Sequence, residues 1–383
     1  MRAFSGMKVL DFTTTIAGPH CGRLLADLGA DVIKVETAEG DLMRSRPPLR
    51  DGASTAYGQL NAGKRSVVLD LKRPEAVAAG RRLINGADIV VENFRPGVMK
   101  RLGLDYASVS AGNPRLIYCS ISGYGQTGPA ADKPAYAPVV HATSGYDLAH
   151  IAYHPGRERP DSCGIFIADV VAGTYAFGAI AAALYQRSVT GKGQHLDVSM
   201  FEGMLSLMTV ELQAAQFAMP PRPKRALYGP AATADGFVNI AVASERTFQD
   251  LAKAAGRPWA TDPRFAKYLD RRANWAEFMD ELESWTRTLT TKELMAVLDR
   301  YGVPAGPYRT VNEALADPQL EHRASLEEVR DAAGAFKVLN PAFRMSASET
   351  RAGPRAPALG EHTREVLTAA GYSEREIAAI TGG

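Results

Sequence analysis

Cysteine is scarce in this chain of 383 residues. The three cysteines, Cys21, Cys119 and Cys163, are scattered, odd in number and without a CxxC pair. This usage excludes a small secreted scaffold held together by disulfides. It predicts reduced thiols in a cytoplasmic protein.

The chain also lacks a charge excess. Its 44 basic and 42 acidic residues leave a net charge of +2, and neither sign forms a long run. This balance argues against nucleic acid or a membrane surface as a partner. The first residues, MRAFSGMKVLDF, contain no long apolar run, so we expect neither a signal peptide nor a membrane span there.

Several catalytic and metal motifs are missing. The seven histidines occur without HExxH, and there is no G-x-S-x-G. His141, His150 and His154, with Asp147 and Asp161, could suggest a metal site, but their spacing matches no common ligand pattern. We therefore predict neither a bound metal nor a hydrolase triad.

What the chain does contain is an alternation of short apolar strands and helices over its first 125 residues. Residues 7–12 predict a buried strand, 21–28 a helix and 31–36 a second strand. The turn between them reads AGPHCG, which lacks G-x-G-x-x-G and disfavours a nicotinamide site. The alternation continues with strands at 65–71, 87–92 and 115–122 and helices at 74–86 and 96–102. It predicts an α/β fold with a mostly parallel, doubly wound sheet.

The whole chain divides into three predicted segments. Residues 1–220 form the N-terminal part of a large domain, which closes with a long Met- and Leu-rich helix at 201–219 and a proline-rich boundary at 220–224. Residues 225–327 predict a smaller α+β domain. Its expected elements are a strand pair in DGFVNIAVAS and helices at 247–255, 274–289 and 291–301. Residues 328–383, with a helix at 363–370, are expected to return to the large domain.

Asp169 is the principal catalytic candidate. Residues 170–184 are nearly all small or apolar, which predicts a helix packed on most sides, and Asp169 stands at its start. One interpretation is an N-cap, favoured by free N–H groups and the helix dipole. The other is a carboxylate nucleophile at the wall of a pocket. Gly173 and Gly178 would let another backbone or a ligand approach closely.

Basic residues gather after two of the predicted strands: Lys64, Arg65 and Lys72, then Arg95, Lys100 and Arg101. They are either solvated surface charges or a binding site for a phosphorylated ligand. Tyr136 lies in a segment rich in glycine and proline at 123–138. It is either a packed aromatic or part of a binding loop.

Long stretches of the chain resemble the family III CoA transferases, a group that includes formyl-CoA transferase, carnitine CoA transferase and α-methylacyl-CoA racemase. The matching stretches run in order over nearly the whole sequence and include VLDFTTTIAGPHCGRLLADLGADVIKVE, NAGKRSVVLDLKRPEA, ADIVVENFRPGVMKRLGL, NPRLIYCSISGYGQTGP, DVVAGTYAFGAIAAALYQRSVTGKGQHLDVSM and APALGEHTREVL. The resemblance implies a Rossmann-like large domain built from both termini, a smaller domain between, and two ring-like subunits interlocked as a homodimer.

The resemblance also implies residue roles. Asp169 matches the aspartate that attacks the acyl-CoA thioester, forms a mixed anhydride and then carries CoA as an aspartyl thioester. Four residues match positions that line the CoA nucleotide: Leu69, Lys72, Arg101 and Leu102. Ile16, beside the first A-G-P, is also predicted to contact CoA. We further expect Tyr136 and His20 at the acceptor pocket. The resemblance implies an acyl-CoA and a small carboxylic acid as substrates, with no permanently bound cofactor. A dicarboxylate or a hydroxy acid is our expectation for the acid, because both are common metabolites.

Departures from the family pattern keep alternatives open. Ile16 replaces a glutamine of formyl-CoA transferase, Thr37 replaces an arginine, and the glycine-rich loop has no counterpart around 228–243. Formate and oxalate are therefore doubtful substrates. Racemase members carry a His-Asp pair where this chain has Tyr136 and Ala137, which poorly serves a two-base proton transfer. Glu245 lies near the position of another acidic residue of the racemases, so racemase activity stays the second alternative. A CoA-binding protein without activity is the third.

Overall fold

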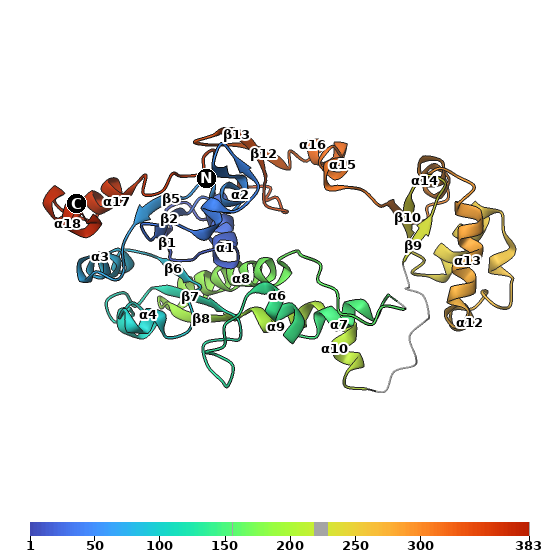
Figure 1. Cartoon of the computed structure of the whole chain (residues 1–383), viewed down its shortest axis with the longest axis horizontal. Helices are drawn as coiled ribbons and strands as arrows, with labels where there is room; N and C mark the ends of the chain where they lie inside the picture. Colours follow the sequence, from blue (N-terminus) through green and yellow to red (C-terminus); the bar gives the residue numbers. More distant parts are fainter. Residues whose placement is uncertain (155, 218–228, 383) are drawn as a thin grey trace. The chain divides into compact units, whose positions relative to one another are not determined.

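The computed structural model describes residues 1–154, 156–217 and 229–382, which fall into two compact units (Figure 1). The large unit comprises Met1–Tyr146, Cys163–Thr209 and Gln319–Gly383. The small unit comprises Asp147–Ser162 and Val210–Pro318. The boundary expected at 220–224 lies outside the described residues.

A six-stranded parallel sheet forms the centre of the large unit. Its strands stand in the order β5 (Arg65–Val68), β2 (Asp31–Glu36), β1 (Lys8–Asp11), β6 (Ile89–Glu92), β7 (Ile117–Ser122) and β8 (Gln194–Ser199). This is the 3-2-1-4-5-6 order of doubly wound sheets, in which the direction of winding reverses between the first and fourth strands. Here the reversal falls between β1 and β6, where Leu10 pairs with Val90.

Helices cover both faces of this sheet because successive strand residues point to opposite sides. Val9, Val32 and Ile89 face one core with α1 (Ala17–Asp27), α6 (Ala137–Thr143), α8 (Ile167–Thr190) and α9 (Met200–Leu207). Leu10 and Val90 face the other, with α3 (Pro74–Asn85), α4 (Val98–Arg101), α5 (Tyr106–Val109), α17 (Thr363–Ala369) and α18 (Glu374–Thr381).

The C-terminal segment lies beside the N-terminal strands (Figure 1). The hairpin β12 (Leu326–Asp331) and β13 (Gly334–Leu339) packs on α2 (Thr55–Asn61), next to η1 (Leu42–Ser45), β3 (Leu49–Arg50) and β4 (Ala53–Ser54). Downstream, Val68 N donates to Thr363 Oγ1 over 3.0 Å, and His362 N donates to Ser66 O over 2.9 Å. Sequence-distant segments thus complete one core.

The small unit has its own sheet and core. Its antiparallel strands stand in the order β11 (Ala305–Pro307), β10 (Phe237–Ile240) and β9 (Pro230–Ala232). Phe278 packs edge-on against Phe248, Trp259 and Phe265 in the aromatic core. The helical elements of this part of the chain are α11 (Glu245–Ala255), η2 (Pro258–Ala260), α12 (Tyr268–Ala273), α13 (Trp275–Thr286), α14 (Thr291–Arg300), α15 (Val311–Leu315) and α16 (Pro318–His322).

Three expectations for these elements were wrong. DGFVNIAVAS contains one strand, β10, whose partners come from elsewhere in the chain. The single helix expected at 201–219 is two helices, α9 and α10 (Thr209–Ala214), because Met208 departs from helical geometry with φ −90° and ψ 58°; residues 218 and 219 lie outside the described part. The Asp169 helix is not packed on most sides.

That helix, α8, is longer than expected and spans 24 residues. It is long and apolar enough to cross a membrane by length and composition, a test that core helices also pass. In this structure it packs along α1, α6, α9, β7 and β8. Its opposite side leaves Val170, Tyr175, Tyr185 and Val189 exposed.

Candidate active site

A pocket of about 630 Å³ opens where the winding of the sheet reverses. Its walls include residues 14–17 after β1, 93–96 after β6 and 121–123 at the end of β7. In doubly wound sheets, ligands bind outside the carboxyl ends of the strands at this reversal. The pocket therefore occupies the position that the topology favours for a ligand. We call it the Asp169 pocket after the one carboxylate among its described lining residues.

Asp169 reaches this pocket from the first turn of α8. The N-cap of the helix is Phe166, and no side chain caps it, so the N-cap interpretation of Asp169 is wrong. Burial raises the pKa of Asp169 from 3.8 to about 6, although a hydrogen bond from the Ala17 backbone lowers it in part. The carboxylate is thus mostly ionised at neutral pH yet poorly solvated, as a nucleophile requires.

Gly173 allows α1 and α8 to approach each other this closely. A Cβ on Gly173 would lie 2.4 Å from Ala17 O, a backbone atom that cannot turn aside. The expectation of close backbone approach at Gly173 is confirmed, whereas a Cβ on Gly178 would meet open space. The glycine therefore sets the distance between the Ala17 backbone and the Asp169 turn.

His141 supports the same turn, a role that was not predicted from the sequence. Its side chain is buried, and its Nε2 accepts a hydrogen bond from Ala168 N over 3.1 Å. This nitrogen must therefore be unprotonated, and the imidazole satisfies one of the free N–H groups at the start of α8. No spacing in the sequence links residue 141 to 168, because α6 and α8 meet only in the folded chain.

Lys64 is neither a surface charge nor part of a phosphate-binding site. Its side chain is fully buried, and its Nζ donates to Asp11 Oδ2 over 2.8 Å and to Pro19 O and Asn61 Oδ1 over 2.9 Å. Burial lowers the pKa of Lys64 to about 8, against the effect of Asp11. Lys64 therefore holds the sheet end and α1 together.

Four of the five residues predicted to contact CoA lie outside the Asp169 pocket. Lys72, Arg101 and Leu102 line a second, open pocket of about 580 Å³ beside α3. Arg81 and Arg82 line it as well, so it is strongly basic. Leu69 is only 1% exposed and belongs to the core beneath, and it does not reach either pocket in the described residues.

The other predicted residues also divide. Ile16 was predicted to contact CoA, but it lines the Asp169 pocket. Tyr136, predicted at the acceptor pocket, lines the Asp169 pocket as well and is 64% exposed. His20 lies outside this pocket in the described structure, where its Nε2 is 3.3 Å from Thr174 Oγ1. Burial and the charges of Lys64 and Arg23 lower the pKa of His20 to about 4, so it is neutral at pH 7.

Three cations of the Asp169 pocket were not singled out as substrate residues. Arg46, Arg95 and Lys133 line it with exposed side chains, and none of them forms an ion pair within the described part of the chain. Arg95 was predicted to be either a solvated surface charge or a phosphate contact. The pocket therefore offers positive charge near Asp169 for an anionic ligand.

The alternative candidates lie elsewhere. Glu245 belongs to the small unit and pairs with Arg271 over 3.1 Å. His150 and His154 also belong to that unit, with their Nε2 atoms 3.4 Å apart. Among residues 1–154, 156–217 and 229–382, no group of three or more His, Cys, Asp or Glu is placed to hold a metal ion.

The large unit is a doubly wound α/β domain with a carboxylate in a pocket where the winding of the sheet reverses, and comparisons with known proteins identify its family. The profile of CoA-transferase family III matches residues 4–363. The succinyl-CoA–D-citramalate CoA-transferase of Chloroflexus aurantiacus is 38% identical over 393 residues, covering 99% of this chain and 97% of that enzyme. The succinate–glutarate CoA-transferase of Agrobacterium fabrum is 36% identical over 381 residues, covering 95% and 94%.

A solved structure agrees. The CAIB/BAIF family protein from Brucella suis matches with a TM-score of 0.83 at 34% identity, covering 96% of this chain and 99% of that chain. The chain belongs to CoA-transferase family III. It is an enzyme that transfers CoA between an acyl-CoA and a carboxylate, as the resemblance implied.

Proposed function

We propose that Asp169 is the nucleophile of this CoA transfer. The observation that carries the proposal is its half-buried carboxylate, lining the pocket at the sheet's reversal with its pKa raised to about 6. A partly desolvated carboxylate attacks more readily than a hydrated one. The Ala17 hydrogen bond orients it without removing its charge.

In the proposed reaction, an Asp169 oxygen attacks the thioester carbonyl, the C–S bond breaks, and CoA leaves as thiolate from a mixed anhydride. The thiolate then attacks the Asp169 carbonyl carbon, which expels the donor acid as a carboxylate and leaves an aspartyl-CoA thioester. The acceptor carboxylate attacks this thioester and releases thiolate. The thiolate finally takes the acceptor acyl group, and Asp169 is regenerated with no net proton transfer.

For CoA we propose the basic pocket beside α3. Lys72 and Arg101 would bind phosphate groups there, and Leu102 would supply apolar contact. Leu69 would act from beneath, by packing in the core under this surface.

A dicarboxylic acid is the proposed class of acceptor. Arg46, Arg95 and Lys133 give the Asp169 pocket more positive charge than one reacting carboxylate needs. Two relatives carry names that specify succinyl-CoA, citramalate, succinate or glutarate, which are derived from dicarboxylic acids. Tyr136 and Ile16 would shape the remaining wall of the pocket. His20, on α1, would act indirectly through its contact with Thr174 on α8.

The direct experiment is an exchange assay. Purified protein is incubated with succinyl-CoA or acetyl-CoA and a panel of mono- and dicarboxylic acids, and the CoA products are identified by mass. Dicarboxylates are expected to accept CoA faster than monocarboxylates of equal length. Exchange with monocarboxylates alone would contradict the proposed substrate class.

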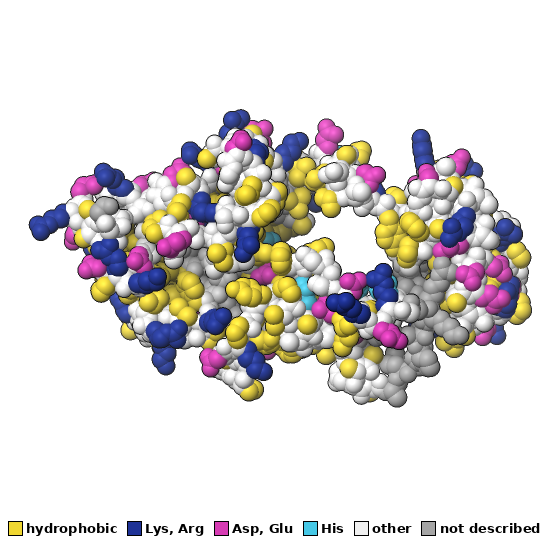
Figure 2. Space-filling model, viewed as in Figure 1, with side chains coloured by type: hydrophobic (Ala, Val, Ile, Leu, Met, Phe, Trp, Pro, Cys, Tyr) yellow, Lys and Arg dark blue, Asp and Glu magenta, His cyan; other side chains and the backbone are white. Residues whose placement is uncertain are grey.

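We also propose that the chain acts as an interlocked homodimer in the cytoplasm. Exposed hydrophobic side chains on α8 and α9 include Tyr175, Tyr185 and Leu207. Figure 2 shows that hydrophobic side chains form several patches on the surface of the large unit. Apolar surface of this kind commonly marks a protein–protein interface. Three free cysteines, two of them buried, support a reducing compartment.

A further inference from the structure

The loop between β1 and α1 contains an unusual backbone. Thr15 adopts φ +72°, a left-handed conformation that β-branched residues rarely adopt. The loop nevertheless forms the wall of the Asp169 pocket and leads directly into Ala17, whose backbone bonds to Asp169. Something must hold Thr15 in this conformation.

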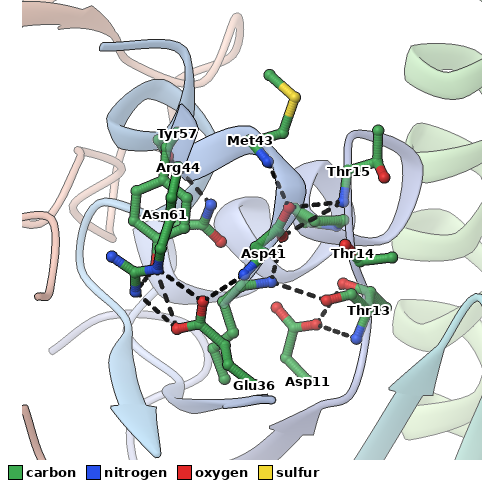
Figure 3. Close-up of polar contacts among 12 residues, drawn as sticks. Asp11, Thr13, Thr14, Thr15, Glu36, Asp41, Met43, Arg44, Tyr57 and Asn61 are labelled. Atoms are coloured by element: carbon green, nitrogen blue, oxygen red, sulfur yellow. Dashed lines mark hydrogen bonds and ion pairs between the residues drawn. The ribbon is translucent and has the colours of Figure 1, made fainter. Parts of the chain in front are cut away.

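Asp41 supplies that restraint. Its Oδ1 accepts hydrogen bonds from Thr15 N over 3.1 Å and from Met43 N over 2.9 Å, as Figure 3 shows. On the other side of the loop, Asn93 Oδ1 accepts from Thr14 N and Asn93 Nδ2 donates to Thr14 O, each over 2.9 Å. The pocket wall is thus held by the loop after β2 on one side and by the residue that follows β6 on the other.

Lys34 completes the arrangement from the middle of β2. Its Nζ lies 2.8 Å from Asp41 Oδ2 and donates to Thr13 O over 2.7 Å, and both charged side chains are almost fully buried. Burial alone would lower the pKa of Lys34, but the carboxylates of Asp11 and Asp41 raise it above the ordinary value, so the ammonium stays charged. A buried pair with these extra bonds is costly to rearrange.

We propose that Lys34 and Asp41 form a positioning pair for the nucleophile. The pair fixes Thr13 and Thr15, which places the N–H of Ala17 at the Asp169 carboxylate and stabilises its ionised form. The inference rests on the proposed role of Asp169. Neither Lys34 nor Asp41 lines the pocket, so both act through the loop and not on the substrate.

The test measures the pKa of Asp169 itself. Protein labelled with carboxyl-¹³C aspartate is titrated by NMR, and the Asp169 signal is assigned by its loss in Asp169→Asn. In Asp41→Ala the pKa should rise by about one pH unit, the effect of losing one hydrogen bond to a charged group. The loss of the Asp41 negative charge alone would lower the pKa of Asp169, so a rise cannot come from that charge. Arg46, Arg95 and Lys133 face the same pocket and are unchanged in the variant.

Asp27→Ala is the matched control. Asp27 also forms a buried ion pair, 2.6 Å from Arg23, but it does not bond to the loop. The control should lose stability and leave the Asp169 pKa in place. If Asp41→Ala does not fold, the double variant Lys34→Met/Asp41→Leu fills the same space without an unpaired buried charge and without an acceptor for Thr15 N, and it should still raise the pKa.

An unchanged or lower pKa in the Asp41 variants would overturn the proposal. Exchange activity gives an independent result, with an expected loss of about 10-fold in kcat for Asp41→Ala. If Asp169→Asn instead retains full exchange, the proposed nucleophile is wrong, while the titration still decides whether Asp41 controls the pKa of residue 169.

Discussion

At the scale of single residues, burial and one hydrogen bond act on Asp169 in opposite directions. Burial dominates and raises its pKa to about 6, and the Ala17 N–H retains enough of the charged form for attack at neutral pH. The same balance implies that ionised Asp169 costs folding energy. The active site is therefore expected to be a point of local destabilisation in the large unit.

This cost gives a pH-dependent prediction. Because the folded pKa of about 6 exceeds the ordinary 3.8, the wild-type protein loses stability as pH rises between these values. Asp169→Asn removes the ionisation and should be more stable by up to about 3 kcal/mol at pH 8, and equally stable near pH 3. Urea unfolding at both pH values measures the difference. A variant less stable at pH 8 would contradict the cost assigned to Asp169.

The same pKa sets the pH dependence of the rate. Attack requires the carboxylate, so kcat/KM should fall about tenfold per pH unit below about pH 6. The profile is measured with saturating acceptor. A rate that stays level down to pH 4.5 would show that Asp169 is ionised there and that burial does not raise its pKa.

At the scale of elements, the contact between α1 and α8 determines where the nucleophile stands. Gly173→Ala would place a Cβ 2.4 Å from Ala17 O and force the two segments apart. We expect a loss of about 1–3 kcal/mol of stability and, because small displacements of reacting groups are costly, at least about a tenfold loss of kcat.

The matched control for this prediction is Gly178→Ala on the same helix. A Cβ there meets open space within the chain, and alanine favours helix by about 1 kcal/mol over glycine. Thermal unfolding and the exchange assay on both variants separate the effects. Equal behaviour of the two variants would mean that the close approach at Gly173 is not needed.

Element prediction from the sequence succeeded where local pattern decides structure. The segments at β2 and β7 are apolar runs bounded by turn residues, and both are strands as predicted. The break at Met208 was missed because apolar residues continue on either side of it. The burial of Lys34 could have been predicted but was not. Its sequence sign is that Lys34 is the one cation within the apolar strand DVIKVE.

At the scale of the whole molecule, the parallel sheet could be predicted from the strand–helix alternation, but the segments that pack against it could not. Which helix covers which face, and that the C-terminal segment pairs with β5, depend on contacts between sequence-distant residues. The same is true of the site. Family resemblance indicated Asp169. The contact of His141 with the Asp169 turn and the contact of Asp41 with Thr15 depend on the folded chain, because each joins residues that are distant in sequence.

The proposed homodimer belongs to this scale as well. Exposed aromatic and aliphatic side chains on α8 would be buried by a second chain, so the assembly should persist on dilution. Light scattering at micromolar protein should give about twice the chain mass of 41.1 kDa. A stable species of one chain mass would contradict the proposed dimer.

Acylation of Asp169 is the step on which the proposed mechanism depends, and hydroxylamine trapping detects it. Wild-type protein is incubated with succinyl-CoA, treated with hydroxylamine and digested, and the peptides are analysed by mass. Hydroxylamine attacks anhydrides and thioesters of aspartate, so we expect a hydroxamate at Asp169 alone, formed only when the acyl-CoA is present. An unmodified Asp169 peptide during active exchange, or a hydroxamate at another carboxylate, would contradict it.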